Sequence, residues 1–216
     1  MVTKQQQTAL LREFFHSGKR MKLKRGQIID RSNDQAPFGI YYIETGFVKA
    51  YAITKYGEEN LMVIRKDTEV FPLIRTFTGL RRDIVYEAMS DCVVWRKLSD
   101  EYVRFVDEHQ EILPILLDAA VDMYLLHSVH LNSLEYRTVR ERVISFLLML
   151  EHRFGKQTSN GVLIDAPIRR QDIASSVSAT RETTSRVLTS LSRNGLISAD
   201  KGQIVLTDIE SLRALL

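Results

Sequence analysis

The sequence has little cysteine and little net charge. Cys92 is the one cysteine among 216 residues, so an internal disulfide is impossible and an iron–sulfur cluster would lack its several thiolate ligands. No apolar run reaches the roughly eighteen residues that a membrane-spanning helix needs. Residues 1–15 also lack the basic start and apolar block of a secretion signal. We therefore expect a cytoplasmic protein that has no membrane partner.

The residue patterns of an enzyme are missing as well. No nucleophile–base set, glycine-rich phosphate loop or metal-ligand spacing occurs in the sequence. His127 and His130 stand three positions apart on an expected helix, but no third ligand accompanies them, so we interpret them as surface or interface residues. We predict that the chain is not an enzyme, has no catalytic residues, and needs no metal and no cofactor.

The charges are distributed unevenly along the chain. The formal net charge is only +3, yet residues 136–216 contain twelve Lys and Arg against eight Asp and Glu. Residues 1–135 are close to neutral. A surface that binds phosphate groups needs such a local basic excess, so nucleic acid is a candidate partner of the carboxyl-terminal part.

Residues 23–98 have the composition of short strands separated by turns. Aromatic and β-branched residues are concentrated in 41–43, 47–53, 61–64, 84–88 and 92–95. Glu44-Thr45-Gly46 is a hairpin signal, and a second turn is centred on Gly57. Turns at this regular spacing predict a compact antiparallel barrel or sandwich.

A helical pattern replaces the strands after Ser99. Apolar residues recur at spacings of three and four up to Leu134, and Pro114 suits a first helical turn. The apolar stripe is wider than one core-facing side requires, so we expect this helix to pack on its own barrel and on the same helix of a second copy. A single core helix is the alternative. The dimerisation residues that we predict are Leu116, Ala119, Met123 and Leu126.

The remaining residues predict a helix, a helix–turn–helix and a hairpin. A helix over 137–154 ends at Gly155, and Pro167 precedes two short helices within 168–197. Residues 196–207 would form a hairpin that flanks them as a wing. Arg181, Glu182 and Arg186 fall in the first turns of the second short helix. Such forked donors and acceptors suit base edges in a major groove of DNA.

Two motifs lie at a characteristic spacing in this segment: Arg170-Gln171-Asp172-Ile173-Ala174, then Thr180-Arg181-Glu182-Thr183-x-Ser185-Arg186. Together with weaker matches at Gly26-Gln27-Ile28-Ile29 and Ile43-x-x-Gly46-x-Val48, they resemble the Crp/Fnr family of bacterial transcription regulators. The resemblance implies an α+β fold. Its expected parts are an antiparallel β-barrel or jelly-roll sensor domain (1–105), a dimerisation helix (106–135) and a winged helix-turn-helix domain (136–216).

The resemblance implies that Arg181, Glu182 and Arg186 read bases. Arginine can pair bidentately with guanine, and glutamate can accept from the cytosine amino group. Stabilisation of the helix amino terminus is the alternative role of Glu182. The other DNA-binding residues that we predict are Thr180, Thr183, Ser185, Arg169 and Arg170. Thr180 is also the expected helix cap.

Two positions in this motif depart from the family pattern. Arg169 occupies the usual threonine cap position, so its side chain either contacts a phosphate or is solvated. Ser178 stands where many members have a turn glycine, which predicts a strained turn.

The expected sensor domain departs further from the family. Members that bind cyclic AMP carry Gly-Glu-Leu and then Arg-Ser/Thr, but this chain has Thr68 to Leu73 and then Arg82-Asp83. Pro72 removes a backbone donor, Leu73 cannot bind ribose hydroxyls, and Asp83 would repel a phosphate. Because only Arg82 is retained, we predict that neither cyclic AMP nor cyclic GMP binds.

These features predict a homodimeric regulator that binds double-stranded DNA at a pseudo-palindromic site. Two recognition helices would enter major grooves about 34 Å apart. By resemblance, an activator that contacts RNA polymerase is the expected mode. The barrel either needs no effector or takes an unidentified small ligand, with Tyr41, Phe47, Phe71 and Tyr86 as candidate lining. A ligand-sensing module that binds protein is a further alternative, although the basic helix argues against it.

Overall fold

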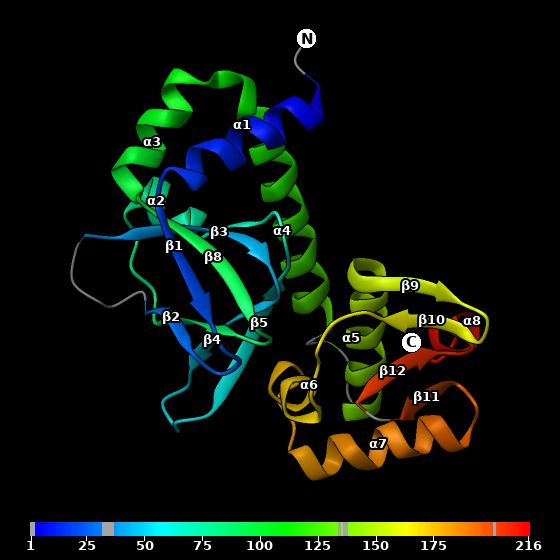
Figure 1. Ribbon diagram of the computed structural model, residues 1–216. Coiled ribbons are helices and arrows are strands. Elements are labelled where there is room, and N and C mark those ends of the chain that lie inside the picture. The colour runs from blue at the N-terminus through cyan, green and yellow to red at the C-terminus, as the bar shows by residue number, and fades with distance from the viewer. Residues whose placement is uncertain (1–2, 32–36, 134, 136–137, 201) are drawn as a thin grey trace. The chain divides into compact units, whose positions relative to one another are not determined.

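The computed structural model describes residues 3–31, 37–133, 135, 138–200 and 202–216 (Figure 1). The chain divides into two compact units. The first comprises Met1–Gly57 and Met62–Met123, and the second comprises Glu58–Leu61 and Tyr124–Leu216. No helix in the described ranges has the length and apolar character that crossing a membrane requires.

Two antiparallel sheets form the centre of the first unit. One has the strand order β1 (Lys19–Leu23), β8 (Cys92–Leu98), β3 (Gly39–Thr45) and β6 (Val70–Phe71). The other has the order β2 (Ile28–Arg31), β7 (Ile84–Ala88), β4 (Val48–Ile53) and β5 (Glu59–Arg65). Buried side chains of both sheets, among them Ile43, Val48 and Val94, share one core. The expected antiparallel sheet domain is thereby confirmed.

Helices add a second core to this unit. They are α1 (Lys4–His16), α2 (Leu73–Thr78), α3 (Ser99–Glu108), the short 3-10 helix η1 (Gln110–Ile112) and α4 (Leu113–Ser133). Phe15, Tyr102 and Phe105 are buried together in this cluster, and the rings of Phe14 and Phe105 stack with their centroids 4.1 Å apart. The sequence patterns did not predict α1 or α2, whereas α3 lies where a helical pattern was expected after Ser99.

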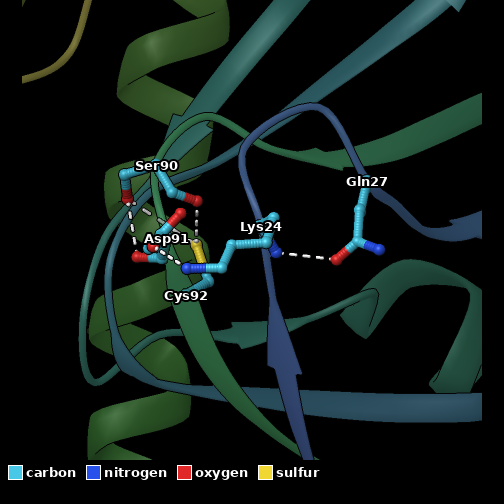
Figure 2. Close-up of polar contacts among 5 residues, drawn as sticks. All are labelled: Lys24, Gln27, Ser90, Asp91 and Cys92. Atoms are coloured by element: carbon cyan, nitrogen blue, oxygen red, sulfur yellow. Dashed lines mark hydrogen bonds and ion pairs between the residues drawn. The ribbon is translucent and has the colours of Figure 1, made fainter.

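Two turns that lead from one sheet to the other enclose the cysteine: the turn at Gly46 between β3 and β4, and the turn at Ser90 and Asp91 between β7 and β8. The expected hairpin at Glu44-Thr45-Gly46 is therefore wrong, because β3 and β4 belong to different sheets. The Cys92 thiol lies 3.3 Å from the carbonyl oxygen of Ser90, and Lys24 Nζ is 2.6 Å from Asp91 Oδ2 (Figure 2). Gly46 has φ = +101°, and a Cβ there would come within 2.7 Å of the Cys92 sulfur. Glycine is therefore required at this turn, and Cys92, with 3% of its surface exposed, is a packed core residue.

Helix α4 has a broad apolar surface, as the sequence predicted. Pro114 is its second residue. Of the predicted dimerisation residues, Leu116, Met123 and Leu126 are half-buried and Ala119 is exposed, and Leu116 packs on the helical core of its own unit. The most exposed large apolar residues of the helix lie on a neighbouring stripe that comprises Leu117, Val121, Tyr124, Leu125 and Leu131.

The second unit is a winged helix domain. Its helices are α5 (Val139–Phe154), α6 (Arg170–Ser176), α7 (Arg181–Arg193) and α8 (Ile209–Arg213). Its antiparallel sheet has the order β11 (Ile197–Asp200), β12 (Gln203–Leu206), β10 (Gly161–Ile164) and β9 (Gly155–Thr158). Strands β11 and β12 form the predicted wing. Thr138 caps α5, where its Oγ1 accepts the amide of Glu141 at 3.2 Å. The expected α+β fold with a carboxyl-terminal helix-turn-helix domain is confirmed.

Candidate nucleic-acid interface

Helix α7 is amphipathic, with a sharp division between its two faces. Thr184, Leu188 and Leu191 are at most 1% exposed and follow a spacing of four and three residues. On the opposite face, the exposed side chains are those of Glu182, Arg186, Thr189 and Arg193, whereas Arg181 is exposed because it lies in the first turn, on the side of Thr184 and Leu188. Because residues four and seven positions apart share one side of a helix, Glu182, Arg186, Thr189 and Arg193 form one continuous stripe.

The start of α7 is fixed by a threonine cap. Thr180 Oγ1 accepts the amide of Thr183 at 3.1 Å and donates to Thr183 Oγ1 at 2.9 Å. The prediction that Thr180 caps this helix is confirmed. The cap satisfies an amide that would otherwise lack a partner in the first turn. It also fixes the backbone directly before Arg181 and Glu182, whose side chains are exposed.

The turn between α6 and α7 is strained at the position where the sequence predicted it. Ser178 has φ = +50°, in the left-handed region that favours glycine. The amide of Ala179 donates to the carbonyl oxygen of Ala174 at 3.0 Å and closes the turn. A β-carbon in this conformation costs on the order of 1 kcal/mol.

Helix α6 begins without a cap from the side chain at its N-cap position, Arg169. Instead, Asp172 Oδ2 accepts the Arg169 amide at 2.8 Å. The Asp172 residue is 8% exposed, whereas the Arg169 and Arg170 side chains are exposed. This bond is the half of a capping box that the third helical residue supplies, and it uses the side chain of neither arginine.

Several basic residues of this unit are engaged within the chain. Arg142 Nε donates to the Val177 carbonyl oxygen at 3.0 Å, and Arg140 Nη1 lies 3.5 Å from Ser190 Oγ. Lys156 pairs with Asp165 at 2.6 Å. These three basic side chains are therefore held by contacts within the unit.

Five arginines of α6 and α7 keep their guanidinium groups unpaired within the described ranges: Arg169, Arg170, Arg181, Arg186 and Arg193. Glu182 and Arg186 stand one helical turn apart, yet no ion pair of 4.0 Å or less joins them. Both side chains thus keep their hydrogen-bonding groups available to solvent or to a partner.

The predicted interface residues differ in their accessibility. The side chains of Arg181, Glu182 and Arg186 are exposed, and Glu182 and Arg186 share one face of α7, whereas Thr183 and Ser185 are half-buried. Arg169 and Arg170 lie at the start of the other helix of the motif. Sequence reasoning missed Thr189 and Arg193, although their spacing from Arg186 could have revealed them.

Three of the four candidate effector-lining residues lie in the core of the first unit, and the fourth, Phe47, is half-buried. The rings of Tyr41 and Phe71 stack with centroids 5.3 Å apart, and those of Phe71 and Tyr86 with centroids 4.8 Å apart. Burial raises the pKa of both tyrosine hydroxyls. Phe47 is half-buried and does not belong to this core cluster. The three clustered rings are part of the packed core between the sheets.

Two domain models match the chain. The cyclic nucleotide-binding domain matches residues 20–109, and the Crp-like helix-turn-helix domain matches residues 141–215. The global nitrogen regulator of Synechocystis sp. is 29% identical over 168 residues, which are 76% of this chain and 74% of that protein. The transcriptional activator protein anr of Pseudomonas aeruginosa is 28% identical over 200 residues, 89% and 78% of the two chains.

The fold is also that of a solved structure, a CooA mutant from Carboxydothermus hydrogenoformans. The TM-score is 0.79 at 18% identity, over 94% of this chain and 89% of the other. The two domain matches follow each other in the order of the two units, and the second covers α6 and α7. The chain is therefore a member of the Crp/Fnr family of DNA-binding transcription regulators.

Proposed function

We propose that this protein is a cytoplasmic transcription activator that binds a pseudo-palindromic DNA site as a homodimer and needs no cyclic nucleotide. The observation that carries the proposal is the exposure of Arg181 in the first turn of α7 and of Glu182 and Arg186 on its exposed face, where they have no intramolecular partner in the described chain. An arginine-rich face without internal ion pairs suits a negatively charged double helix.

The three residues would divide the reading of bases among them. Arg181 and Arg186 each carry a forked donor that matches the two acceptors of guanine, and Glu182 accepts from a cytosine amino group. Each well-formed bidentate contact contributes about 1–3 kcal/mol of discrimination between bases. Thr180, Thr183, Ser185, Arg169 and Arg170 would contact the sugar–phosphate backbone and set the register.

Dimerisation would use the surface of α4. Leu117, Val121 and Tyr124 are 65%, 48% and 72% exposed, and an apolar stripe of this kind on a helix is stabilised by pairing with a second helix. Leu116, Met123 and Leu126 are half-buried and would border the contact, while the exposed Ala119 permits close approach. The paired helices of two copies would then present two copies of α7 to one operator.

Independence from cyclic nucleotides is supported by the segment after β6. Leu73 packs against the helical core, and Pro72 is the residue that precedes α2. Arg82 and Asp83 are both exposed. A cyclic nucleotide phosphate would therefore meet a carboxylate next to the one retained arginine.

Activation through contact with RNA polymerase is proposed from the relatives alone. One of them, the protein of Pseudomonas aeruginosa, is named a transcriptional activator. No residue of this chain is assigned to the polymerase contact.

Selection of DNA from a random duplex pool tests the proposal. The full-length protein should enrich a two-fold symmetric site, and cyclic AMP should leave the affinity unchanged. The double variant Arg181→Ala/Arg186→Ala should lose the selection, whereas Arg213→Ala on α8 serves as a matched control that should keep it. Enrichment only in the presence of cyclic AMP would contradict the nucleotide independence. Absence of any enriched site would favour the protein-binding alternative.

A further inference from the structure

Helix α2 directs an arginine into the first unit. Arg75 is the one buried residue of this helix and is only 4% exposed. Its Nη2 forms an ion pair with Asp30 Oδ2 on β2 and lies 3.4 Å from the carbonyl oxygen of Gly39. The guanidinium carbon is 4.8 Å from the centre of the Phe38 ring.

The buried positive charge of Arg75 needs a negative charge or hydrogen-bond acceptors close to it. Removing a guanidinium from water is costly unless an opposite charge and hydrogen bonds replace the water. The side chains of Arg75 and Asp30 are 3% and 9% exposed, so solvent screens their attraction little. The carboxylate of β2 therefore neutralises the arginine of α2 and links the helix to the second sheet.

Two other arginines of the first unit have partners of their own. Arg65 pairs with Glu69 at 3.3 Å, and Arg96 donates to the Pro37 carbonyl oxygen at 3.1 Å. Asp30 and Arg75 both act electrostatically on the buried hydroxyls of Tyr41 and Tyr86. The ion pair thus lies against the aromatic core of the sheets.

The ion pair leaves two nitrogen donors of the Arg75 guanidinium without a hydrogen-bond acceptor in the described part of the chain. Nε and Nη1 of Arg75 are buried, and no atom in the described ranges accepts from them. Without the Asp30 carboxylate, this guanidinium would be a buried and uncompensated donor set. Its planar fork matches a small carboxylate.

We propose that Asp30 is a built-in anion of the sensor domain, which occupies Arg75 and removes the need for a diffusible anionic effector. Arg75 is distinct from Arg82, the exposed arginine at the position of the family motif, and its partner is a residue of the chain itself. The expected effect on DNA binding rests on the proposed function. The ion pair between Asp30 and Arg75, and the replacement of the Asp30 carboxylate by an anion in solution, do not.

The test replaces the built-in anion by one in solution. Full-length Asp30→Asn is compared with the natural protein in chloride and in acetate at constant ionic strength. In chloride, the melting temperature of the variant should fall by on the order of 10 °C, and acetate should restore a large part of it. Its affinity for the selected DNA site should fall at least tenfold in chloride and recover in acetate. The melting temperature and the DNA affinity of the natural protein should be the same in chloride and in acetate.

Two further variants serve as controls. Asp91→Asn removes an equivalent carboxylate from the exposed pair with Lys24, whose side chain is 80% exposed (Figure 2), and should change neither stability nor the response to acetate. Asp30→Asn/Arg75→Met removes both charges. It should be more stable than Asp30→Asn and should not respond to acetate, because no buried charge is left to compensate.

The possible results separate the proposals. An Asp30→Asn variant with natural stability and no acetate response would overturn the built-in anion, as would a double variant that fails to fold. Should Asp30→Asn alone be insoluble, a well-folded double variant would still support the charge compensation. If the natural protein bound no DNA in either salt, the proposed function would fail, and the melting temperatures would still decide the role of Asp30.

Discussion

The Asp172 carboxylate accepts the backbone amide of Arg169 at 2.8 Å, across the first turn of α6. The bond uses the main chain of Arg169 and leaves its side chain exposed. The same residue therefore begins the helix through its amide and offers a guanidinium to a partner.

Replacing Arg169 by alanine should separate these two roles. Because the capping bond does not involve the side chain, the free energy of unfolding should stay within about 0.5 kcal/mol of its original value. Affinity should weaken equally for all DNA sequences, and the salt dependence of log K should decrease by about one unit. Binding titrations at several salt concentrations measure both quantities. Unchanged affinity would identify Arg169 as a solvated residue.

Arg181→Ala should have a different effect. Loss of a bidentate contact with guanine should cost about 1–3 kcal/mol of binding free energy and relax the preference at one base pair. Binding to single-base variants of the selected site measures this. Arg170→Ala is the comparison, because a phosphate contact should weaken all sequences alike. A uniform loss for Arg181→Ala would assign that residue to the backbone too.

Ser178→Gly should stabilise the second unit. Glycine adopts the φ of +50° that Ser178 has without steric cost, so the free energy of unfolding should rise by about 0.5–1 kcal/mol. Ser192→Gly, inside the right-handed helix α7, is the control and should destabilise by a few tenths of a kcal/mol. Denaturation in urea measures both changes. A loss of stability in Ser178→Gly would show that the serine turn is not strained.

The buried hydroxyl of Thr184 predicts a second stabilising change. Thr184 is fully buried, and its Oγ1 has no hydrogen-bond partner among the described atoms. Thr184→Val keeps the shape and removes the unsatisfied group, which should add about 1 kcal/mol to the free energy of unfolding. DNA affinity should not change, because this residue lies on the buried face of α7. Destabilisation would indicate that the hydroxyl has a partner, such as a buried water.

The exposed stripe of α4 predicts where a dimer can be disrupted. Leu117→Glu should yield monomers and abolish binding to the symmetric site, because a carboxylate would be buried between two helices. Light scattering measures the mass in solution. Ile53→Glu, at a residue that is 51% exposed on β4, should leave the assembly intact. A dimeric Leu117→Glu variant would move the interface away from this stripe.

Local sequence signals predicted much of the second unit and part of the first. The strand-like run at 84–88 coincides with β7, and the predicted wing at 196–207 contains β11 and β12, because strand preference and burial agree there. Thr180 marked the start of α7, since a capping hydroxyl acts on an amide three residues away. These elements could be predicted because they are determined by residues that are close together in the sequence.

Other features depend on contacts between distant residues. Arg75 has the composition of a surface residue, and only its pairing with Asp30, 45 positions away, explains its burial. The helix α1 is mostly polar and is held by a few buried residues such as Leu11 and Phe15. In α4, the pattern showed a broad apolar surface but not which edge the protein's own core covers, so the exposed stripe required the structure.

The contacts of Arg140 and Arg142 with the helix-turn-helix have a consequence for operator choice. They fasten α5 to the turn before α7 and to Ser190 within α7, so the recognition helix cannot swivel independently of α5. The second unit should therefore bind a half-site as one rigid body. Inserting one base pair between two half-sites turns one of them by about 35° around the DNA axis. Because α5 and α7 are joined by these contacts, the second unit itself should not absorb that rotation, and operators with altered spacing should bind more weakly even when both half-sites are perfect.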